Sequence, residues 1–298
     1  MGSFFSRFVC PIGIPICPSL YYDQGYSAMN LGGFLQNKWN GFVSRADLAR
    51  TLSESCDDRL LPFQPVSWPQ SISDPTAYYL NCTRFFHSKA PAFIREHRNY
   101  FQSGQRGFGE DSFHIMWQAL FEACRPKSFL EIGVYRGQVL SLVSLLARQA
   151  RLDCRVCGVS PFSSAGDSVS RYIRNLNYFE DTLANFRAFA LPPPQLIRGS
   201  STDPRVIREF SSNSWDWVYI DGNHEYVVAK QDFLNCSRCL SPGGKIILDD
   251  SALFTSFKPP RYATAGHPGP SRLAGELSSY GFTEVLQVGH NRVFQKSS

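Results

Sequence analysis

The chain of 298 residues has little that would assign it to a membrane, secreted or nucleic-acid-binding class. It contains no run of about 18 uninterrupted apolar residues, so we predict no membrane span. The formal net charge is only +5, and Lys and Arg are scattered among acidic residues instead of forming the basic stripe that a phosphate backbone requires. Nucleic acid is therefore not an expected partner.

The N-terminus also lacks a clear secretion signal. Its apolar stretch, FFSRFVCPIGIPICPSL, is interrupted by three prolines and has no h-region followed by a small-residue cleavage site. The first residues, MGSFFS, match the N-myristoylation pattern at Gly2 and Ser6. An ordinary N-terminus is the favoured interpretation of so short a match.

The cysteines indicate a reducing compartment, because their number, nine, is odd and several lie in apolar runs, as free thiols do. We therefore expect a cytoplasmic location. Two pairs, Cys154/Cys157 and Cys236/Cys239, have the CxxC spacing of a zinc site. The first pair lies in a predicted strand, where positions three apart face opposite sides, and we do not predict structural zinc.

The pattern changes near residue 110, which divides the chain into an N-terminal accessory or cap region (1–109) and a catalytic domain (110–298). The first region is rich in turn formers and aromatics and has little periodicity, so we expect an irregular or helical extension. From Glu110 onward, apolar residues recur at spacings of three and four up to Cys124, which predicts a helix that ends before Pro126.

After that helix, short apolar runs alternate with helical patterns, as in βαβ units. Strands are predicted at 128–133, 155–160, 194–199, 215–221 and 244–250, and helices at 138–150, 172–186 and 225–240. The tail predicts a helix at 271–281 and two strands at 282–289 and 291–297. The expected fold is α/β: a Rossmann-like, doubly wound, mostly parallel seven-stranded sheet with an antiparallel edge pair.

The segment FLEIGVYRGQ carries the first candidate site. Glu131 ends a predicted strand, and Gly133 and Gly137 lead into a helix, so the backbone there could approach a ligand closely. A tight turn alone would also explain the glycines. Their spacing differs from GxGxxG, which disfavours a nicotinamide-dependent oxidoreductase.

From about residue 128 to the C-terminus, the chain resembles class I S-adenosylmethionine-dependent methyltransferases, with LEIGVYRG as the first motif. Within that class, IDGNHEY followed by LDD is similar to the metal-dependent sugar O-methyltransferases of the macrocin and mycinamicin type. The resemblance implies that Asp221, Asp249 and Asp250 bind magnesium or another divalent cation, and that His224, together with Asp221, is catalytic. The expected S-adenosylmethionine contacts are Glu131, Gly133, Tyr135, Gly137, Ser160, Ser201 and Asp221.

The residues themselves support a cation site. Asp221, Asp249 and Asp250 follow neighbouring strands, at the sheet edge where α/β folds bind ligands, and a hard cation would relieve their mutual repulsion. Because Asp249 and Asp250 are adjacent, both can ligate only if the chain leaves the strand there. Otherwise one of them is a ligand and the other caps the next segment or pairs with a basic residue.

His224 lies three residues after Asp221, where an imidazole could accept a proton from a substrate hydroxyl. The alternative role is to cap the helix that begins near Glu225. The acid that holds the ribose in many class I enzymes is replaced by Ser160, so either Ser160 or Asp167, folding back, would have that role.

Three further segments are candidates for ligand contacts, and two of them have an alternative interpretation. Ser201 and Asp203 are candidates for the adenine side, although Asp203 could equally be an N-cap before Pro204. The loop 258–272, KPPRYATAGHPGPSR, could bind the acceptor through Arg261, His267 or Arg272, or be a solvated connector. Segment 97–111 could fold over the cofactor.

The predicted function is magnesium-assisted O-methylation of a hydroxyl on a small molecule, a sugar or glycosylated metabolite, by a chain that could form homo-oligomers. A catechol-like phenol is the nearby alternative acceptor. A non-catalytic S-adenosylmethionine-binding protein is the alternative of a different class, because Ser160 replaces the acid that holds the ribose in many class I enzymes.

Overall fold

The computed structural model describes residues 43–60, 62–164, 166–167, 169–170 and 172–297. The N-myristoylation pattern and two of the nine cysteines, Cys10 and Cys17, lie outside these residues. The seven described cysteines are free thiols. No described helix is long and apolar enough to cross a membrane.

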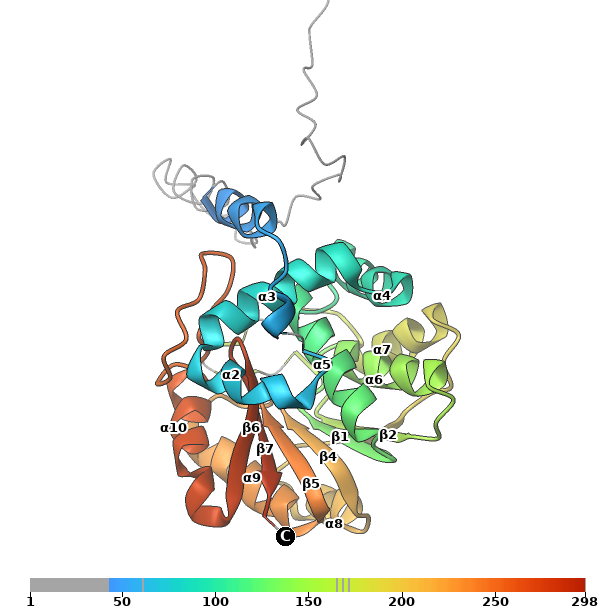
Figure 1. Ribbon diagram of the computed structural model, residues 1–298. Helices are drawn as coiled ribbons and strands as arrows, with labels where there is room; N and C mark the ends of the chain where they lie inside the picture. Colours follow the sequence, from blue (N-terminus) through green and yellow to red (C-terminus); the bar gives the residue numbers. More distant parts are fainter. Residues whose placement is uncertain (1–42, 61, 165, 168, 171, 298) are drawn as a thin grey trace, which may run out of the picture.

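A seven-stranded sheet, in the order β3-β2-β1-β4-β5-β7-β6, forms the centre of the molecule (Figure 1). The strands are β1 (Ser128–Ile132), β2 (Arg155–Ser160), β3 (Gln195–Arg198), β4 (Trp215–Ile220), β5 (Leu240–Leu248), β6 (Phe282–Val288) and β7 (Asn291–Lys296). The first five are parallel, and β7 pairs antiparallel with both β5 and β6. The predicted Rossmann-like sheet with an antiparallel edge pair is confirmed.

The helices of the described chain agree with the predicted pattern over most of its length. They are α2 (Trp68–Ser73), α3 (Pro75–Lys89), α4 (Ala92–Ser103), α5 (Asp111–Cys124), α6 (Gln138–Gln149), α7 (Tyr178–Ala188), α8 (Pro204–Ser211), α9 (Tyr226–Arg238) and α10 (Pro268–Glu276), with 3-10 turns at Asp58–Leu60, Pro65–Ser67 and Leu277–Tyr280.

Several predicted boundaries differ from the structure; for example, the helix predicted at 271–281 is α10 at Pro268–Glu276. The helix predicted at 172–186 begins only at Tyr178, because the Asn177 side chain accepts a hydrogen bond from the Glu180 amide and so caps it. The helix predicted at 225–240 ends at Arg238, and the strand predicted at 244–250 begins at Leu240, so that the SPGG residues 241–244 lie inside β5, where a register shift between Trp215 and Trp217 accommodates them.

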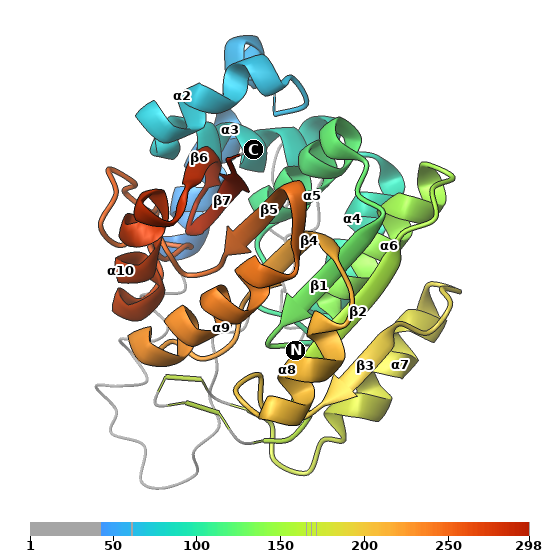
Figure 2. The same cartoon turned by 90° about the horizontal axis from the view of Figure 1, so that it is seen from below.

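Alternate residues of the sheet enter two separate cores. One face packs against α8, α9 and α10 through side chains such as Ile132, Val218 and Ile246. The opposite face packs against α5 and α6, with Phe129 and Trp217 in its core. Figure 2 shows the sheet between these two sets of helices. The doubly wound arrangement therefore follows from the period-two pattern of strands buried on both faces.

The described part of the N-terminal region is helical and packs directly on the sheet domain. Helix α2 packs on β6, and α3 packs on α5 (Figure 1). Tyr78 and Phe86, both on α3, share one hydrophobic core with Trp117 of the following domain. The division at residue 110 stays a prediction, and the continuous core implies that neither part buries its apolar surface alone.

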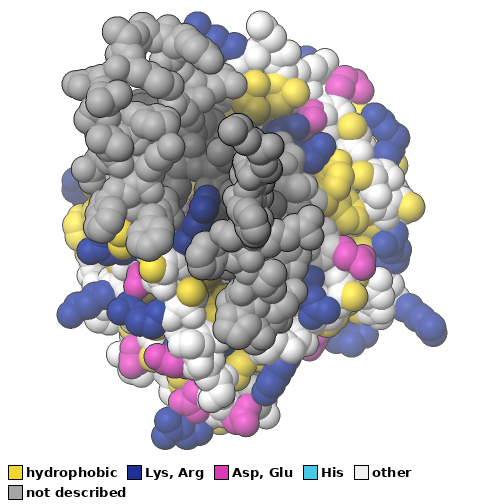
Figure 3. Space-filling model, turned by 90° about the horizontal axis from the view of Figure 1, so that it is seen from above, with side chains coloured by type: hydrophobic (Ala, Val, Ile, Leu, Met, Phe, Trp, Pro, Cys, Tyr) yellow, Lys and Arg dark blue, Asp and Glu magenta, His cyan; other side chains and the backbone are white. Residues whose placement is uncertain are grey.

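The helix at 43–53 contacts a loop from the far end of the chain. Asp47 accepts a hydrogen bond from the Arg261 amide at 2.9 Å, and the Tyr262 hydroxyl donates to Thr51 Oγ1 at 3.0 Å. On the face of the molecule seen in Figure 3, described Lys and Arg side chains are scattered among acidic and apolar ones.

Candidate active site

A cavity of about 450 Å³ lies where the carboxyl ends of β1, β4 and β5 meet. This is the point from which the chain continues to opposite sides of the sheet, and where open α/β sheets bind ligands. The predicted residues that line it are Glu131, Gly133, Tyr135, Asp221, His224, Asp249 and Asp250.

Three of the predicted cofactor contacts do not line this cavity. Gly137, with φ +77°, is the N-cap of α6, and a Cβ there would meet Thr182. Ser160 accepts a hydrogen bond from the Phe162 amide at 3.3 Å through its hydroxyl. Ser201 follows β3, beside the buried Asp232 of α9. Their role in cofactor binding stays a prediction.

Gly133 is required by the packing of two chain segments. Its φ is +101°, and a Cβ at this position would lie 1.9 Å from the backbone oxygen of Asp221. The turn after β1 therefore touches the turn after β4 backbone to backbone. The glycine serves this contact, so a larger residue here would disturb the fold as well as any ligand.

Glu131 is buried at the end of β1, with only 3% of its surface exposed. It accepts a hydrogen bond from the backbone amide of Leu140, at the start of α6. Its Oε2 has no hydrogen-bond partner among the described residues. Burial, together with the charge of Asp249, raises the pKa of Glu131 to about 8. The free oxygen is suited to a hydrogen-bond donor or a cationic group on a ligand.

The chain leaves strand β5 just before Asp249 and Asp250, as it must if both aspartates are to bind one ion. The strand ends at Leu248, and Asp250 has a left-handed backbone with φ +49°. A Cβ on Gly266 would lie 2.2 Å from the carbonyl carbon of Asp250, so the returning loop packs tightly against this turn. As a result, the carboxylates of Asp249 and Asp250 converge with His290, and their ligand atoms all lie within 4.8 Å of one another.

Asp221 and Asp249 form a tightly coupled pair. Burial and the adjacent Asp249 raise the pKa of Asp221 well above its usual range. For Asp249 burial acts in the same direction, but His290 and the hydrogen bond from Asp221 hold its pKa below the usual range. Asp221 therefore carries the proton that the pair shares, and it belongs to neither group of convergent metal-ligand atoms.

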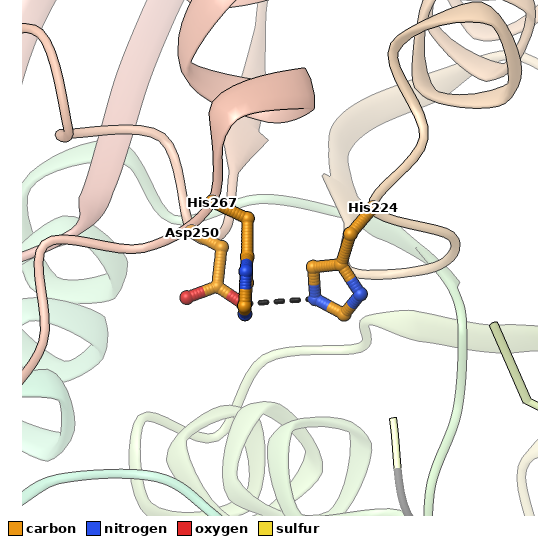
Figure 4. Close-up of side chains that lie close together, drawn as sticks. All are labelled: His224, Asp250 and His267. Atoms are coloured by element: carbon orange, nitrogen blue, oxygen red, sulfur yellow. Dashed lines mark hydrogen bonds and ion pairs between the residues drawn. The ribbon is translucent and has the colours of Figure 1, made fainter. Parts of the chain in front are cut away.

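His224 is held by two carboxylates, one at each ring nitrogen. Its Nδ1 donates to Asp167 at 2.6 Å and its Nε2 to Asp250 at 2.9 Å, as Figure 4 shows for Asp250. Although burial lowers the pKa of His224, these two bonds raise it to about 9. The imidazole is thus positively charged near neutral pH, and Asp167 contacts the histidine. Helix α9 has Glu225 as its N-cap residue, so His224 does not cap it.

Two further histidines line the cavity. His267 Nε2 lies 3.8 Å from Asp250 Oδ2, beside His224 (Figure 4). His290, which the sequence argument missed, comes from the hairpin between β6 and β7, with its Nε2 3.3 Å from Asp249 Oδ1. The sequence signal for it was the two-residue loop Gly289-His290 at the end of an edge hairpin.

The two flanking segments differ in what they bring to the cavity. Segment 97–111 contributes Arg106 to Glu110, and the Gly109 amide donates to Gln138 Oε1 at 3.2 Å. Loop 258–272 contributes Thr264 and His267, whereas Arg261 and Arg272 do not line the cavity. Asp203 accepts a hydrogen bond from the Arg205 amide at 2.7 Å, which fits the N-cap interpretation.

Comparison with known proteins agrees with the fold described above. Residues 130–251 match the sequence family described as a methyltransferase domain. The O-methyltransferase from Bacillus cereus, solved in complex with SAH, is 14% identical, with 79% of this chain and 100% of that chain covered and a TM-score of 0.51. Cofactor-bound Rv0187 from MTB is 15% identical, with 72% and 95% covered and a TM-score of 0.50. No curated protein sequence gives a significant match.

The likeness to these two structures shows a common fold, and the sequence match shows a similarity to methyltransferase domains over residues 130–251. The matched residues begin in β1, at the Glu131 turn, and end just beyond Asp249 and Asp250, so they span the strands that build the cavity. This part of the chain is therefore similar to a methyltransferase domain.

Proposed function

We propose that the chain transfers a methyl group from S-adenosylmethionine to a hydroxyl of a small molecule, a sugar or glycosylated metabolite, with the help of magnesium or another divalent cation. One observation carries the proposal: the turn at Glu131, three carboxylates and His224 face a single cavity in a region similar to a methyltransferase domain. The supporting features are a site for a positively charged cofactor and a cluster of oxygen ligands beside it.

The residues present fit both groups. The free Oε2 of Glu131 is buried and suits the cofactor's positively charged amino group. Asp249 Oδ1 is likewise buried without a hydrogen-bond donor, next to the carboxylate of Asp250. When bound, S-adenosylmethionine supplies the methyl group, and a cation held by Asp249 and Asp250 supplies a Lewis acid that makes the acceptor hydroxyl more acidic.

His224 is proposed as the base. Methyl transfer forms a C–O bond, breaks the S–C bond and releases the hydroxyl proton, which His224 Nε2 would accept. In the present arrangement that nitrogen donates to Asp250. A cation that neutralises Asp250 would weaken this bond and lower the pKa of His224, so that Nε2 loses its proton to solvent before methyl transfer and can accept the hydroxyl proton, while Asp167 continues to hold Nδ1–H and the ring orientation.

A phenolic acceptor is the second candidate, because aromatic side chains line part of the cavity. Phe113, Trp117 and Tyr219 line the cavity, where they could pack against a ring. A sugar would depend more on Glu110, Thr264 and His267, which line the same space.

Titration calorimetry with S-adenosylmethionine, combined with turnover assays on sugar and catechol acceptors with and without chelator, tests the proposal. We expect cofactor binding in both conditions and strong loss of turnover on chelation. The His224→Ala variant should lower the rate by about 10²- to 10⁴-fold with little change in cofactor affinity, and should remove the acid limb of the pH–rate profile. Full activity in excess chelator would contradict the role of the cation, and tight cofactor binding without turnover on any acceptor would favour a binding protein.

A further inference from the structure

The hairpin between β6 and β7 brings His290 to the cavity, and a role for this histidine rests on the proposed function only in that a divalent cation binds there. His290 is 7% exposed, and its ring packs edge-on against Phe113, with centroids 4.7 Å apart. The imidazole is therefore held between the hairpin and α5 with little freedom to rotate.

The hydrogen bond at the other ring nitrogen determines which nitrogen can bind an ion. His290 Nδ1 lies 3.1 Å from the carbonyl oxygen of Thr264. Because a carbonyl only accepts, Nδ1 carries a hydrogen. Although burial lowers it, Asp249 and Asp250 raise the pKa of His290 to about 10, so a metal ion that binds Nε2 must displace the proton there before the lone pair can ligate. A backbone carbonyl in this position is the usual partner of a metal-ligating histidine, where it fixes both the tautomer and the ring direction.

The distances from His290 Nε2 to the nearest carboxylate oxygens are longer than the length of a direct hydrogen bond. It lies 3.3 Å from Asp249 Oδ1 and 3.8 Å from Asp250 Oδ1, whereas charge-assisted N–H···O bonds are about 2.7–2.9 Å long. Ligand atoms that each lie about 2.0–2.2 Å from one ion, in tetrahedral or octahedral geometry, are about 3.0–3.5 Å apart. The closest pair in this group thus has the separation of two neighbouring ligands.

The ligand set is mixed. Asp249 and Asp250 offer carboxylate oxygens and His290 offers an imidazole nitrogen, and the three form one of the two groups of convergent ligand atoms in the described chain. Magnesium prefers oxygen ligands and water, whereas an imidazole nitrogen favours first-row transition metals.

We propose that the cation of this cavity is a first-row transition-metal dication, such as manganese, iron(II), cobalt or zinc, bound by His290 Nε2 together with Asp249 and Asp250. His267, on the other oxygen of Asp250, is not a ligand of this ion. The inference thus specifies the class of metal and adds one ligand from outside the β4 and β5 turns.

The test uses the full chain, freed of metal and titrated with manganese, zinc or magnesium chloride. The His290→Asn variant places an amide near the position of Nδ1, so it can still donate to Thr264 while it removes the Nε2 ligand. The matched control is His267→Ala, which removes the other histidine beside Asp250. Thermal unfolding of each variant checks that it is folded.

Wild type should bind zinc and manganese at least about tenfold more tightly than magnesium. We expect His290→Asn to weaken transition-metal binding by about tenfold or more and to change magnesium affinity less than about twofold. On the manganese-loaded protein, pulsed electron paramagnetic resonance should detect directly bound ¹⁴N, lost in His290→Asn and retained in His267→Ala.

Absence of the ¹⁴N signal in wild type, its persistence in folded His290→Asn, or equal affinity for magnesium and manganese would overturn the inference. Chelator-sensitive methyl transfer supported by magnesium, with no ¹⁴N signal, would leave the proposed function intact and remove the role of His290. His290-dependent metal binding without turnover on any acceptor would support the role of His290 and contradict the proposed function.

Discussion

The two sides of Asp250 show how the same residue types can form two different local structures. On one side, His224 makes direct bonds of 2.6 and 2.9 Å to two carboxylates and is fully engaged. On the other, His290 lies 3.3 and 3.8 Å from two carboxylates, and Asp249 Oδ1 has no hydrogen-bond donor. The first side is a closed ion-pair network, and the second has the spacing of ligands around an ion.

The comparison suggests separate tasks for two similar histidines. Although burial lowers it, nearby carboxylates raise the pKa of both imidazoles, to about 9 for His224 and about 10 for His290. His224, bonded to a carboxylate at each ring nitrogen, is oriented as a base needs once one partner is neutralised. A histidine whose far nitrogen is fixed by a carbonyl presents a lone pair to a cation. Asp250 takes part in both arrangements through different oxygens, so it couples the two sides.

The largest effect on methyl transfer should come from a substitution at Asp250, which links the His224 side and the His290 side. We expect Asp250→Asn to lower methyl transfer by about 100-fold or more, because it removes a proposed metal ligand and a partner of His224. S-adenosylmethionine affinity, measured by calorimetry, should change little. The exposed Asp58→Asn is the control. Wild-type turnover in Asp250→Asn would show that neither side depends on this residue.

The geometry of the Asp250 turn can be tested without changing a ligand. Gly266→Ala should lower the free energy of unfolding by about 1–3 kcal/mol and weaken metal binding, because its Cβ would collide with the Asp250 backbone. Gly243→Ala is the matched control, since Gly243 also has positive φ but nothing within 4 Å of a Cβ. If both variants bind metal alike in calorimetry, the turn does not set the ligand positions.

Asp167→Asn should affect only the His224 side. The direct bond from His224 to the Asp167 carboxylate contributes to its raised pKa of about 9, so loss of that charge should lower this pKa. The acid limb of the kcat profile should move to lower pH, and kcat should fall by about 10- to 100-fold. Metal affinity should be nearly unchanged.

The N-cap variant Asp203→Asn, on α8, provides the control for Asp167→Asn. It should leave the pH–rate profile in place. An unaltered acid limb in folded Asp167→Asn would mean that the limb belongs to a group other than His224.

The smallest effect on activity is expected at Glu110, on the His290 side of the cavity, where the main consequence is for stability. Burial raises the pKa of Glu110 to about 7 from an ordinary value of 4.5. The folded state therefore binds this proton more tightly than the unfolded state, and its contribution to stability is complete below pH 4.5 and lost as the pH rises to about 7. Relative to wild type, Glu110→Gln should become more stable across this range, by up to about 3 kcal/mol.

Urea unfolding at pH 5 and pH 8 measures this difference. Tyr79, whose hydroxyl donates to Glu110 at 2.5 Å, can still donate to the glutamine. A stability difference between the two proteins that does not depend on pH would show that Glu110 is not protonated in the folded state near neutral pH.

Much of the fold could be predicted from the sequence, because strand and helix periodicities are local. The five parallel strands and α5, α6, α9 and α10 lie close to their predicted positions. The helix predicted at 172–186 was too long, since the apolar spacing continued through residues 172–177 while Asn177 stopped the helix. Periodicity describes which face is buried, and the capping residue decides where the helix starts.

The site was predictable to the extent that it follows from the sheet. Asp221, Asp249 and Asp250 come at the carboxyl ends of adjacent parallel strands, so their positions directly after those strands are enough to bring them to one cavity. From the sequence alone, Asp249 and Asp250 could both face the cavity only if the chain left the strand there. The left-handed backbone at Asp250 fulfils this condition.

By itself, then, the sequence determined the parallel sheet, the edge hairpin and the shared position of three carboxylates and Glu131. Only the tertiary structure decided which histidines and acids complete the site. Asp167 lies 57 residues before His224, and His290 reaches Asp249 and Asp250 by way of a hairpin 40 residues along the chain. Such contacts depend on how the edge hairpin and the returning loop pack against the end of β5, and no local pattern of residues encodes that packing.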